Sequence, residues 1–282
     1  MNKTIKELLI ESNNKLRSIT DTPSLDASLL LEKATGLNKI NQIINDNKII
    51  SEEEANTFNL LLNKRMNHEP IAYILGYKEF YSRNFKVTKN TLIPRPDTEI
   101  LVEQVINYIN TLDYSPDLLD LCTGTGCVGL SIALEAEIKE LTLSDISEKA
   151  LEVAKYNSEN LYNKKVKLLK SNLLNKCAKY DIIVSNPPYL TKQWCDILDE
   201  DVKKEPILAL EGFGDDGLDL IREIIKSSKT HFKGEKNAIF LECDSRQCNT
   251  VKTILIDNNF KDIEIIKDLG NRDRVVKGIY ER

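Results

Sequence analysis

The chain has 282 residues, 41% of them apolar, and its 44 acidic side chains outnumber its 39 basic ones. That length and apolar content suffice for one large hydrophobic core and one smaller core, so we expect two domains. The net charge of −5 provides no general attraction to nucleic acid or anionic lipid, and direct nucleic-acid binding is not expected. No apolar run is long enough to cross a bilayer, and the N-terminus lacks the apolar core of a signal peptide. We expect a cytoplasmic monomer without a membrane partner.

Cysteine and histidine usage argues against a metal centre. The six cysteines form no CxxC pair, and the two histidines, His68 and His231, are far apart in the sequence. We therefore expect neither a metal site nor a disulfide framework.

Residues 1–75 are predicted to form a small helical bundle. Thr4 and Ser51 each precede a glutamate by three residues, which is the pattern of a capping box at a helix start. A further amphipathic segment, residues 23–33, ends before Gly36. Acidic and basic residues are nearly balanced here, so composition reveals no basic face.

From Gly76 the hydrophobic period changes. Aromatic and polar residues alternate in "YKEFYSRNFKV" and are interrupted at Ser82-Arg83-Asn84, which predicts a β-hairpin. We assign residues 76–93 to this hairpin linker and residues 94–282 to the second domain, whose first helix is expected near Asp97.

Short apolar strands then alternate with helices, as in a doubly wound, mostly parallel α/β sheet. The last two strands follow each other without a helix, which predicts an antiparallel hairpin at the end. The seven expected strands are residues 117–121, 141–145, 166–170, 181–185, 237–243, 261–267 and 274–280.

A glycine loop follows the first of these strands. "DLCTGTGCVG" places Gly124, Gly126 and Gly129 in GxGxxG register between a strand and a helix, and Asp145 ends the next strand about 20 residues later. This context predicts a nucleotide-type cofactor site; the alternative is a tight turn without a ligand.

Charge separates two cofactor classes that use this loop. A pyrophosphate would be repelled by a carboxylate at Asp120, whereas the sulfonium and ammonium of S-adenosylmethionine would be attracted. Asp145 is predicted to accept hydrogen bonds from both ribose hydroxyls, with Ile146 against the adenine. Asn172 can accept from the adenine amino group while Leu173 packs on the base, although Asn172 is equally well explained as an ordinary loop asparagine.

The segment "NPPY", residues 186–189, follows the fourth strand. Pro187 and Pro188 stiffen the loop and contribute carbonyls without competing N–H donors, and the Asn186 side chain adds another acceptor. Such a site suits a planar NH2 group. We expect Asn186 Oδ1 and the Pro187 carbonyl to orient its nitrogen for methyl transfer, with Tyr189 as a wall; a structural Pro-Pro turn is the alternative.

These motifs together resemble class I S-adenosylmethionine-dependent methyltransferases. "EPIAYILGYKEFYSRNFKVTKNTLIPRPDTE" (69–99), "EPILAL" (205–210) and "DLGNRDRVV" (268–276) narrow the resemblance to the HemK/PrmC family of peptide-chain release factor glutamine methyltransferases. The resemblance implies methylation of the glutamine amide in the Gly-Gly-Gln motif of class 1 release factors. It also implies that the N-terminal helical domain helps to dock this substrate.

The resemblance further implies roles for individual residues. Asn186, Pro187 and Tyr189 would be catalytic, and Asn186, Pro187, Pro188 and Tyr189 would hold the substrate glutamine. The cofactor would contact Cys122, Thr123, Gly124, Thr125, Gly126, Asp145, Asn172, Leu173 and Asn186.

The chain departs from the family pattern at three places. "ECDSRQ" (242–247) lacks a usual glycine, "EGFGDDGLD" (211–219) is one residue longer, and "DLGNRDRVV" shifts its glycine. Asn172 also replaces a more usual acid. Asn172 keeps an acceptor for the adenine amino group, whereas the three segment changes affect the expected docking of the substrate rather than the core chemistry.

Three other functions use similar motifs. A DNA amino-methyltransferase would flip a base onto the same acceptors, but it would need a basic recognition region. A glutamine methyltransferase of a large-subunit ribosomal protein would differ only in its docking surface. A non-catalytic adaptor that binds S-adenosylmethionine would have no need of an intact "NPPY".

Overall fold

The computed structural model describes residues 3–282, and the chain divides into two units. The first unit runs to Tyr77 and also includes Asp199–Lys204. The second consists of Lys78–Leu198 and Glu205–Arg282. The sequence predicted domain boundaries at residues 75 and 93. It did not predict that Asp199–Lys204 belongs to the first unit.

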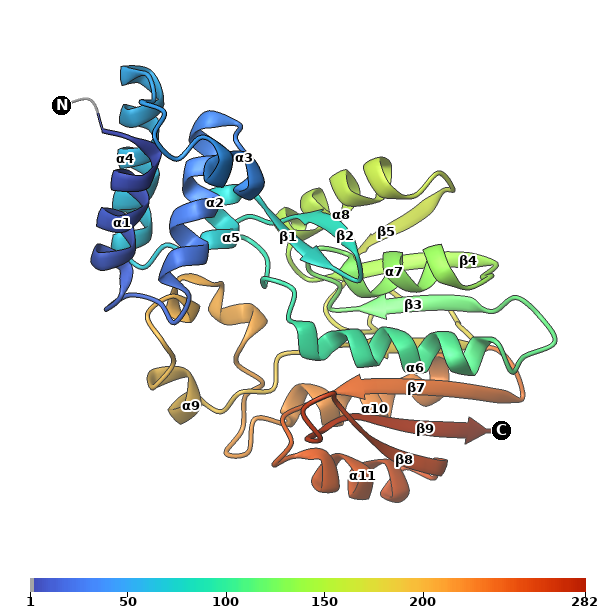
Figure 1. Ribbon diagram of the computed structural model, residues 1–282. Helices are drawn as coiled ribbons and strands as arrows, with labels where there is room; N and C mark the ends of the chain where they lie inside the picture. The colour runs from blue at the N-terminus through green and yellow to red at the C-terminus, as the bar shows by residue number, and fades with distance from the viewer. Residues whose placement is uncertain (1–2) are drawn as a thin grey trace. The chain divides into compact units, whose positions relative to one another are not determined.

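The first unit is a bundle of helices (Figure 1), and its capping boxes form as predicted. The Thr4 and Ser51 side chains each accept a hydrogen bond from the backbone of the glutamate three residues later. Gly36 ends the second helix in the left-handed region, at φ 72°. The helices are α1 (Ile5–Leu16), α2 (Pro23–Thr35), α3 (Lys39–Ile44), α4 (Glu52–Met66) and α5 (Ile71–Leu75).

A buried ion pair lies inside this unit. Arg65 of α4 donates to Asp26 of α2 at 2.7 Å and lies 2.8 Å from Asp201 in the returning segment. Two acidic partners offset the cost of burying the guanidinium, so Arg65 joins segments that are distant in sequence.

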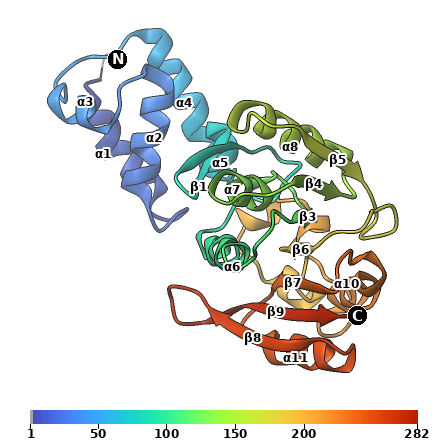
Figure 2. The ribbon, with the colours of Figure 1, turned by 90° about the vertical axis from the view of Figure 1, so that its right-hand side faces the viewer.

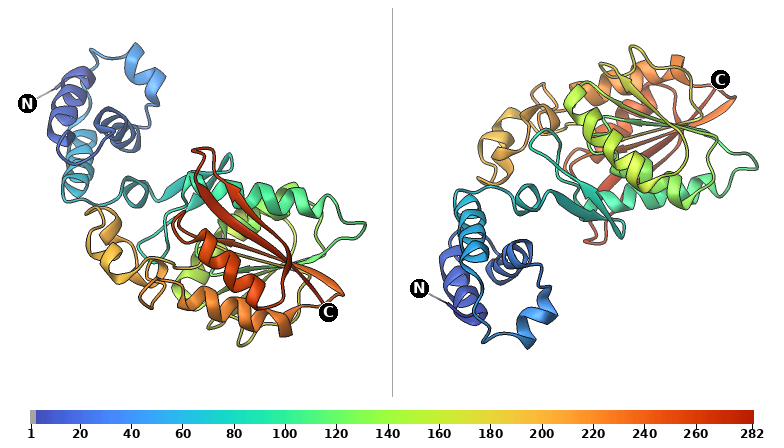
Figure 3. Two further views of the ribbon diagram at one scale, coloured as in Figure 1. Left: turned by 90° about the horizontal axis from the view of Figure 1, so that it is seen from below. Right: turned by 90° about the horizontal axis from the view of Figure 1, so that it is seen from above.

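The second unit contains the predicted seven-stranded sheet, in the order β5-β4-β3-β6-β7-β9-β8. All pairings from β5 to β7 are parallel, while β9 is antiparallel to both of its neighbours, which confirms the terminal hairpin. The hairpin lies along α11 (Cys248–Asp257), as Figure 3 shows. The strands are β3 (Asp117–Leu121), β4 (Glu140–Asp145), β5 (Val166–Lys170), β6 (Ile182–Ser185), β7 (Lys236–Glu242), β8 (Lys261–Lys267) and β9 (Asp273–Glu281).

Helices cover both faces of the sheet (Figure 2). Alternate strand residues such as Leu118 and Ile182 pack under α6 (Glu99–Ile109), α7 (Cys127–Glu135) and α8 (Glu148–Leu161). Their neighbours Leu119 and Ile183 pack under α10 (Asp219–His231) and α11. The central strands are apolar on both faces because both faces are covered.

Several local elements differ from expectation. The hairpin β1 (Tyr77–Phe80) and β2 (Arg83–Lys86) turns at Tyr81-Ser82, so Arg83 and Asn84 belong to the second strand rather than to the turn. A 3-10 turn, η1 (Pro96–Thr98), precedes α6. Helices α3, α5, α9 (Lys192–Asp196) and α10 were not predicted; α10 begins without a side-chain cap, and α5 and α9 are only five residues long. None of the helices in residues 3–282 has the length and hydropathy of a membrane span.

Candidate active site

The second unit has a cavity at the carboxyl ends of its central strands. Chain order reverses between β3 and β6, and ligands of open α/β sheets bind at such a reversal. The cavity has a volume of about 370 Å³, within the usual size of small-molecule sites. Its lining consists of Asn90, Thr91, Leu92, Leu121, Cys122, Gly124, Asp145, Ile146, Ser147, Ala150, Ser171, Asn172, Leu173, Asn186, Pro188, Pro206, Leu208, Ala209, Phe213 and Leu220.

The glycine loop needs its glycines for two reasons. Gly124 and Gly126 have φ angles of 55° and 82°, in the left-handed region that favours glycine. Gly129 lies so close to the sheet that a Cβ would be 2.7 Å from Leu143 and 2.8 Å from Asp120. The third glycine therefore lets α7 pack directly on β3 and β4.

Asp120 does not face the cavity, contrary to the prediction that its carboxylate meets a cationic ligand. Its Oδ2 accepts hydrogen bonds from Gly129 N at 2.9 Å and from the Thr123 hydroxyl at 2.5 Å. Strand alternation turns this side chain under α7, where burial raises its pKa to about 7. Asp120 thus stabilises the glycine loop through these two hydrogen bonds.

Four backbone N–H groups of the loop are unavailable to a pyrophosphate, which is a different reason from the one predicted. A phosphate-binding loop offers free backbone N–H groups, whereas here the N–H groups of Gly124 and Gly129 are already bound by Asp145 and Asp120. Those of Thr123 and Gly126 donate to the Ser144 and Thr123 carbonyls.

Asp145 lines the cavity where β4 ends, as predicted. Its Oδ2 accepts from Gly124 N at 2.9 Å and its Oδ1 from Ser147 N at 2.8 Å. Burial raises the pKa of this carboxyl, and these backbone bonds oppose the rise. Each oxygen can accept a further hydrogen bond, so a diol such as that of ribose can be bound by both.

The neighbouring lining residues have different characters. Ile146 is partly exposed and gives an apolar wall beside Asp145. Asn172 is exposed, and Leu173 has a positive φ of 45°. An acceptor beside an apolar side chain suits a heteroaromatic ring that carries an amino group.

The Asn186 loop lies on the opposite side of the reversal, after β6. The Asn186 side-chain nitrogen donates to Thr98 Oγ1 at 3.2 Å, which leaves its oxygen available as an acceptor. No described residue donates a hydrogen bond to the Pro187 carbonyl. The Tyr189 hydroxyl donates to Glu242 Oε1 at 3.4 Å, and burial raises the pKa of Tyr189.

A second loop holds the end of this segment in place. Leu190 N donates to the Leu210 carbonyl, and Gly212 N donates to the Leu190 carbonyl. A Cβ on Gly212 would lie 2.0 Å from the Gly217 carbonyl oxygen and 2.7 Å from that of Pro188, so only glycine fits.

Gln247, within the unusual "ECDSRQ", joins the two loops. Its side-chain nitrogen donates to the Tyr189 carbonyl at 2.8 Å and to the Asp216 carbonyl at 2.7 Å. Its side-chain oxygen accepts from Asp244 N at 3.2 Å. The segment that departs from the family pattern therefore supports the Asn186 loop.

The structure brings most of the predicted site residues together. Thr123, Thr125 and Gly126 support the loop without lining the cavity, and neither Pro187 nor Tyr189 lines it. The predicted site residues that line the cavity are Cys122, Gly124, Asp145, Asn172, Leu173, Asn186 and Pro188.

The sequence did not predict the cavity walls that come from segments far from the glycine loop and "NPPY". Leu92, Leu208 and Phe213 belong to "LIPRPDTE", "EPILAL" and "EGFGDDGLD", motifs that were recognised without a role. Asn157 was also missed; its side chain binds the Thr125 carbonyl and the backbone of Lys86, which ties β2 to the glycine loop.

Two structural comparisons show the fold. A methyltransferase from Pyrococcus furiosus has a TM-score of 0.52 and 17% identity, covering 81% of this chain and 99% of that one. The 16S rRNA N2 G1207 methyltransferase of T. Thermophilus, solved with AdoMet and guanosine, has a TM-score of 0.50 and 16% identity, covering 73% and 50%. The second unit thus has the class I methyltransferase fold that the sequence predicted.

Sequence comparisons define the family. A model described as the PrmC N-terminal domain matches residues 7–76, and one described as the methyltransferase small domain matches residues 96–203. The release factor glutamine methyltransferase of Clostridium acetobutylicum is 40% identical over 282 residues, covering 98% of each chain. That of Clostridium botulinum is 39% identical, covering 97% of this chain and 98% of its own. The chain belongs to the release factor glutamine methyltransferase family.

Proposed function

We propose that this protein transfers the methyl group of S-adenosylmethionine to the side-chain amide nitrogen of the glutamine in the Gly-Gly-Gln motif of class 1 release factors, in the cytoplasm. The observation that carries the proposal is the placement of Asn186. It lines the same cavity as Asp145, and its amide nitrogen is turned away to Thr98, so an acceptor oxygen remains for an NH2 group.

The residues of the cavity fit S-adenosylmethionine. Asp145 provides acceptors for the ribose hydroxyls, Ile146 and Leu173 provide apolar walls for the adenine, and Asn172 provides an acceptor for its amino group. The occupied N–H groups of the glycine loop suit a cofactor without phosphates. Bound there, S-adenosylmethionine supplies an electrophilic methyl group.

The Asn186 loop prepares the nitrogen that receives this group. An amide nitrogen is a weak nucleophile because its lone pair is delocalised into the carbonyl. Asn186 Oδ1 and the Pro187 carbonyl accept hydrogen bonds from the NH2 group and turn its lone pair toward the methyl. Both bonds strengthen as positive charge grows on the nitrogen, and no strong general base is needed because the proton becomes acidic after the methyl arrives.

The test is methyl transfer from labelled S-adenosylmethionine to an unmethylated release factor. We expect label on this protein and none on a copy whose Gly-Gly-Gln glutamine is replaced by alanine. Large-subunit ribosomal proteins and DNA are offered in parallel. Label on either of these, with none on the release factor, would contradict the proposal and favour one of the other two methyltransferase functions.

Asp145→Ala is expected to weaken the binding of S-adenosylmethionine by about 10- to 100-fold, the effect of losing hydrogen bonds to a charged acceptor. Isothermal calorimetry measures this affinity. Glu148→Gln is the control, because it removes a nearby negative charge from an exposed pair with Lys170 outside the cavity lining. An unchanged affinity in Asp145→Ala would refute the role of Asp145.

We also propose that the helical domain, residues 1–75, docks the release factor. Helix α3 supports this role, because three isoleucines within six residues are strongly exposed: Ile40 at 67%, Ile43 at 68% and Ile44 at 73%. Exposed apolar side chains gathered on one short helix are typical of a protein-binding surface.

Replacing Ile40, Ile43 and Ile44 together with serine is expected to raise KM for the release factor by about tenfold or more, since each loses apolar contact area. The value of kcat and the affinity for the cofactor should stay unchanged. Leu60→Ser, at an exposed position of α4, is the control. Steady-state kinetics with intact release factor make the measurement, and an unchanged KM would remove α3 from the docking surface.

A further inference from the structure

The amide of Asn186 is anchored by a residue far away in the sequence. Its side-chain nitrogen donates to the hydroxyl of Thr98, which ends η1 and is only 2% exposed. Thr98 is also the N-cap of α6, yet its side chain makes no capping hydrogen bond. The hydroxyl is therefore directed to Asn186 rather than to the helix.

Glu242 lies near the Thr98 hydroxyl. It ends β7 and is 1% exposed; burial raises its pKa to about 7, while a hydrogen-bonding interaction with Thr98 and the charge of Arg274 lower it. Its Oε2 makes no hydrogen bond to a described residue, so this oxygen can accept one. When ionised, this carboxyl can only accept a hydrogen bond, so a Thr98 hydroxyl that donates to it is left to accept from Asn186.

The direction of the hydrogen bond between Asn186 and Thr98 matters because an asparagine amide has nearly the same shape after a half-turn. With its nitrogen on Thr98, Asn186 presents oxygen; after a half-turn it would present NH2 to the NH2 of the substrate, and two donors cannot bind each other. We infer that Thr98 is a positioning residue that fixes the Asn186 amide with its oxygen toward the substrate glutamine. The inference rests on the proposed function for the identity of the substrate.

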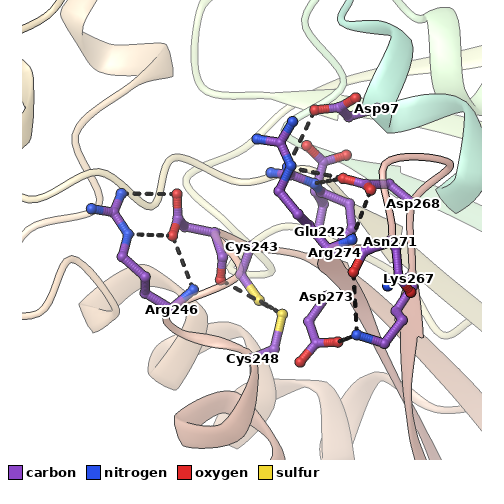
Figure 4. Close-up of polar contacts among 12 residues, drawn as sticks. Asp97, Glu242, Cys243, Arg246, Cys248, Lys267, Asp268, Asn271, Asp273 and Arg274 are labelled. Carbon is purple, nitrogen blue, oxygen red and sulfur yellow. Dashed lines mark hydrogen bonds and ion pairs between the residues drawn. The ribbon is translucent and has the colours of Figure 1, made fainter.

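Figure 4 shows Arg274 among the carboxylates of Asp97, Asp268 and Glu242. Its guanidinium lies 3.2 Å from Asp97 Oδ2 and 3.1 Å from Asp268 Oδ2, beside Glu242. Asp97 directly precedes Thr98, so Arg274 ties η1 to the end of the sheet. Tyr189 reaches the same carboxylate of Glu242 from the Asn186 loop. "RPDT", "NPPY" and "DLGNRDR" thus meet around one buried carboxylate.

The test compares Thr98→Val, which keeps the shape of the side chain but removes the hydroxyl, with Thr98→Ser, which keeps the hydroxyl. We expect Thr98→Val to lower kcat by about tenfold or more, with KM and cofactor affinity within about twofold. Thr98→Ser should restore most of the lost turnover. Thr98→Ala serves as a second variant without the hydroxyl in case valine does not fit. If the role of Thr98 were merely structural, all three variants would lose thermal stability, and kcat would not differ between Thr98→Ser and the two variants without the hydroxyl.

A second measurement does not depend on activity. The side-chain NH2 resonances of Asn186 are assigned by their absence in Asn186→Ala. One amide proton is expected to shift upfield in Thr98→Val and to stay in place in Thr98→Ser, because only serine preserves the hydrogen bond.

The two measurements separate the inference from the proposed function. If the wild-type protein methylates the release factor but Thr98→Val turns over like Thr98→Ser, the positioning role is overturned and the function stands. If the wild-type protein transfers no label, the function fails, and the amide resonances still decide the role of Thr98. Identical Asn186 resonances in the wild-type protein and Thr98→Val would overturn it.

Discussion

Asn186→Ala is expected to lower kcat for methylation of the release factor by about 10²–10³, the scale seen when one preorganised group that stabilises developing charge is removed. The substitution removes the acceptor that orients the substrate nitrogen and strengthens as its positive charge grows. The glycine loop and Asp145 remain, so the affinity for S-adenosylmethionine should change little. Single-turnover kinetics with saturating cofactor separate this chemical step from binding.

Asn249→Ala is the control for this variant. It makes the same truncation on the exposed surface of α11, outside the cavity lining. Its turnover should match that of the wild-type protein. Full activity in Asn186→Ala would eliminate the proposed mechanism, whereas a parallel loss in both variants would indicate damage to the fold.

Arg274→Met is expected to destabilise the second unit by about 3–5 kcal/mol, because it leaves buried acidic groups without their cation. The side chains of Arg274 and Asp268 are only 10% and 2% exposed, and Glu242 lies beside them. Denaturant unfolding followed by the fluorescence of Trp194, the chain's one tryptophan, reports on this unit.

Arg222→Met is the matched control. Arg222 pairs with Asp216 and Asp219, but both sides of these pairs are about half exposed. Exposed ion pairs contribute about 1 kcal/mol or less, so this variant should unfold almost like the wild-type protein. Equal destabilisation of the two variants would show that burying Arg274 with Asp268 and Glu242 adds nothing to the free energy of unfolding beyond what an exposed ion pair contributes.

Local sequence predicted the parts of the site that depend on one strand and the turn after it. Gly124, Gly126 and Gly129 are required by backbone angles and a close approach within a single strand-turn-helix unit. Asp145 and Asn186 follow strands whose apolar pattern is unmistakable. Because parallel strands end at one edge of the sheet, their order alone placed these two residues at one cavity.

Asp120 shows the limit of this reasoning. Its position at the end of β3 predicted a carboxylate at the ligand, but whether a side chain points to the edge or to a face depends on what covers that face. Here the missing Cβ of Gly129 leaves room beneath α7, and the carboxylate satisfies the N–H of Gly129 there.

By itself the sequence determined the doubly wound sheet, the helical N-terminal unit, the glycine loop and the acceptor-rich "NPPY" segment, because each depends on the spacing of neighbouring residues. Only the tertiary structure decided which distant side chains complete the site. Thr98 binds Asn186 although 88 residues separate them in the sequence, and Glu242 on a separate strand accepts a hydrogen bond from Tyr189. Such pairings depend on how helices and strands pack, and packing is set by the whole core rather than by any local pattern.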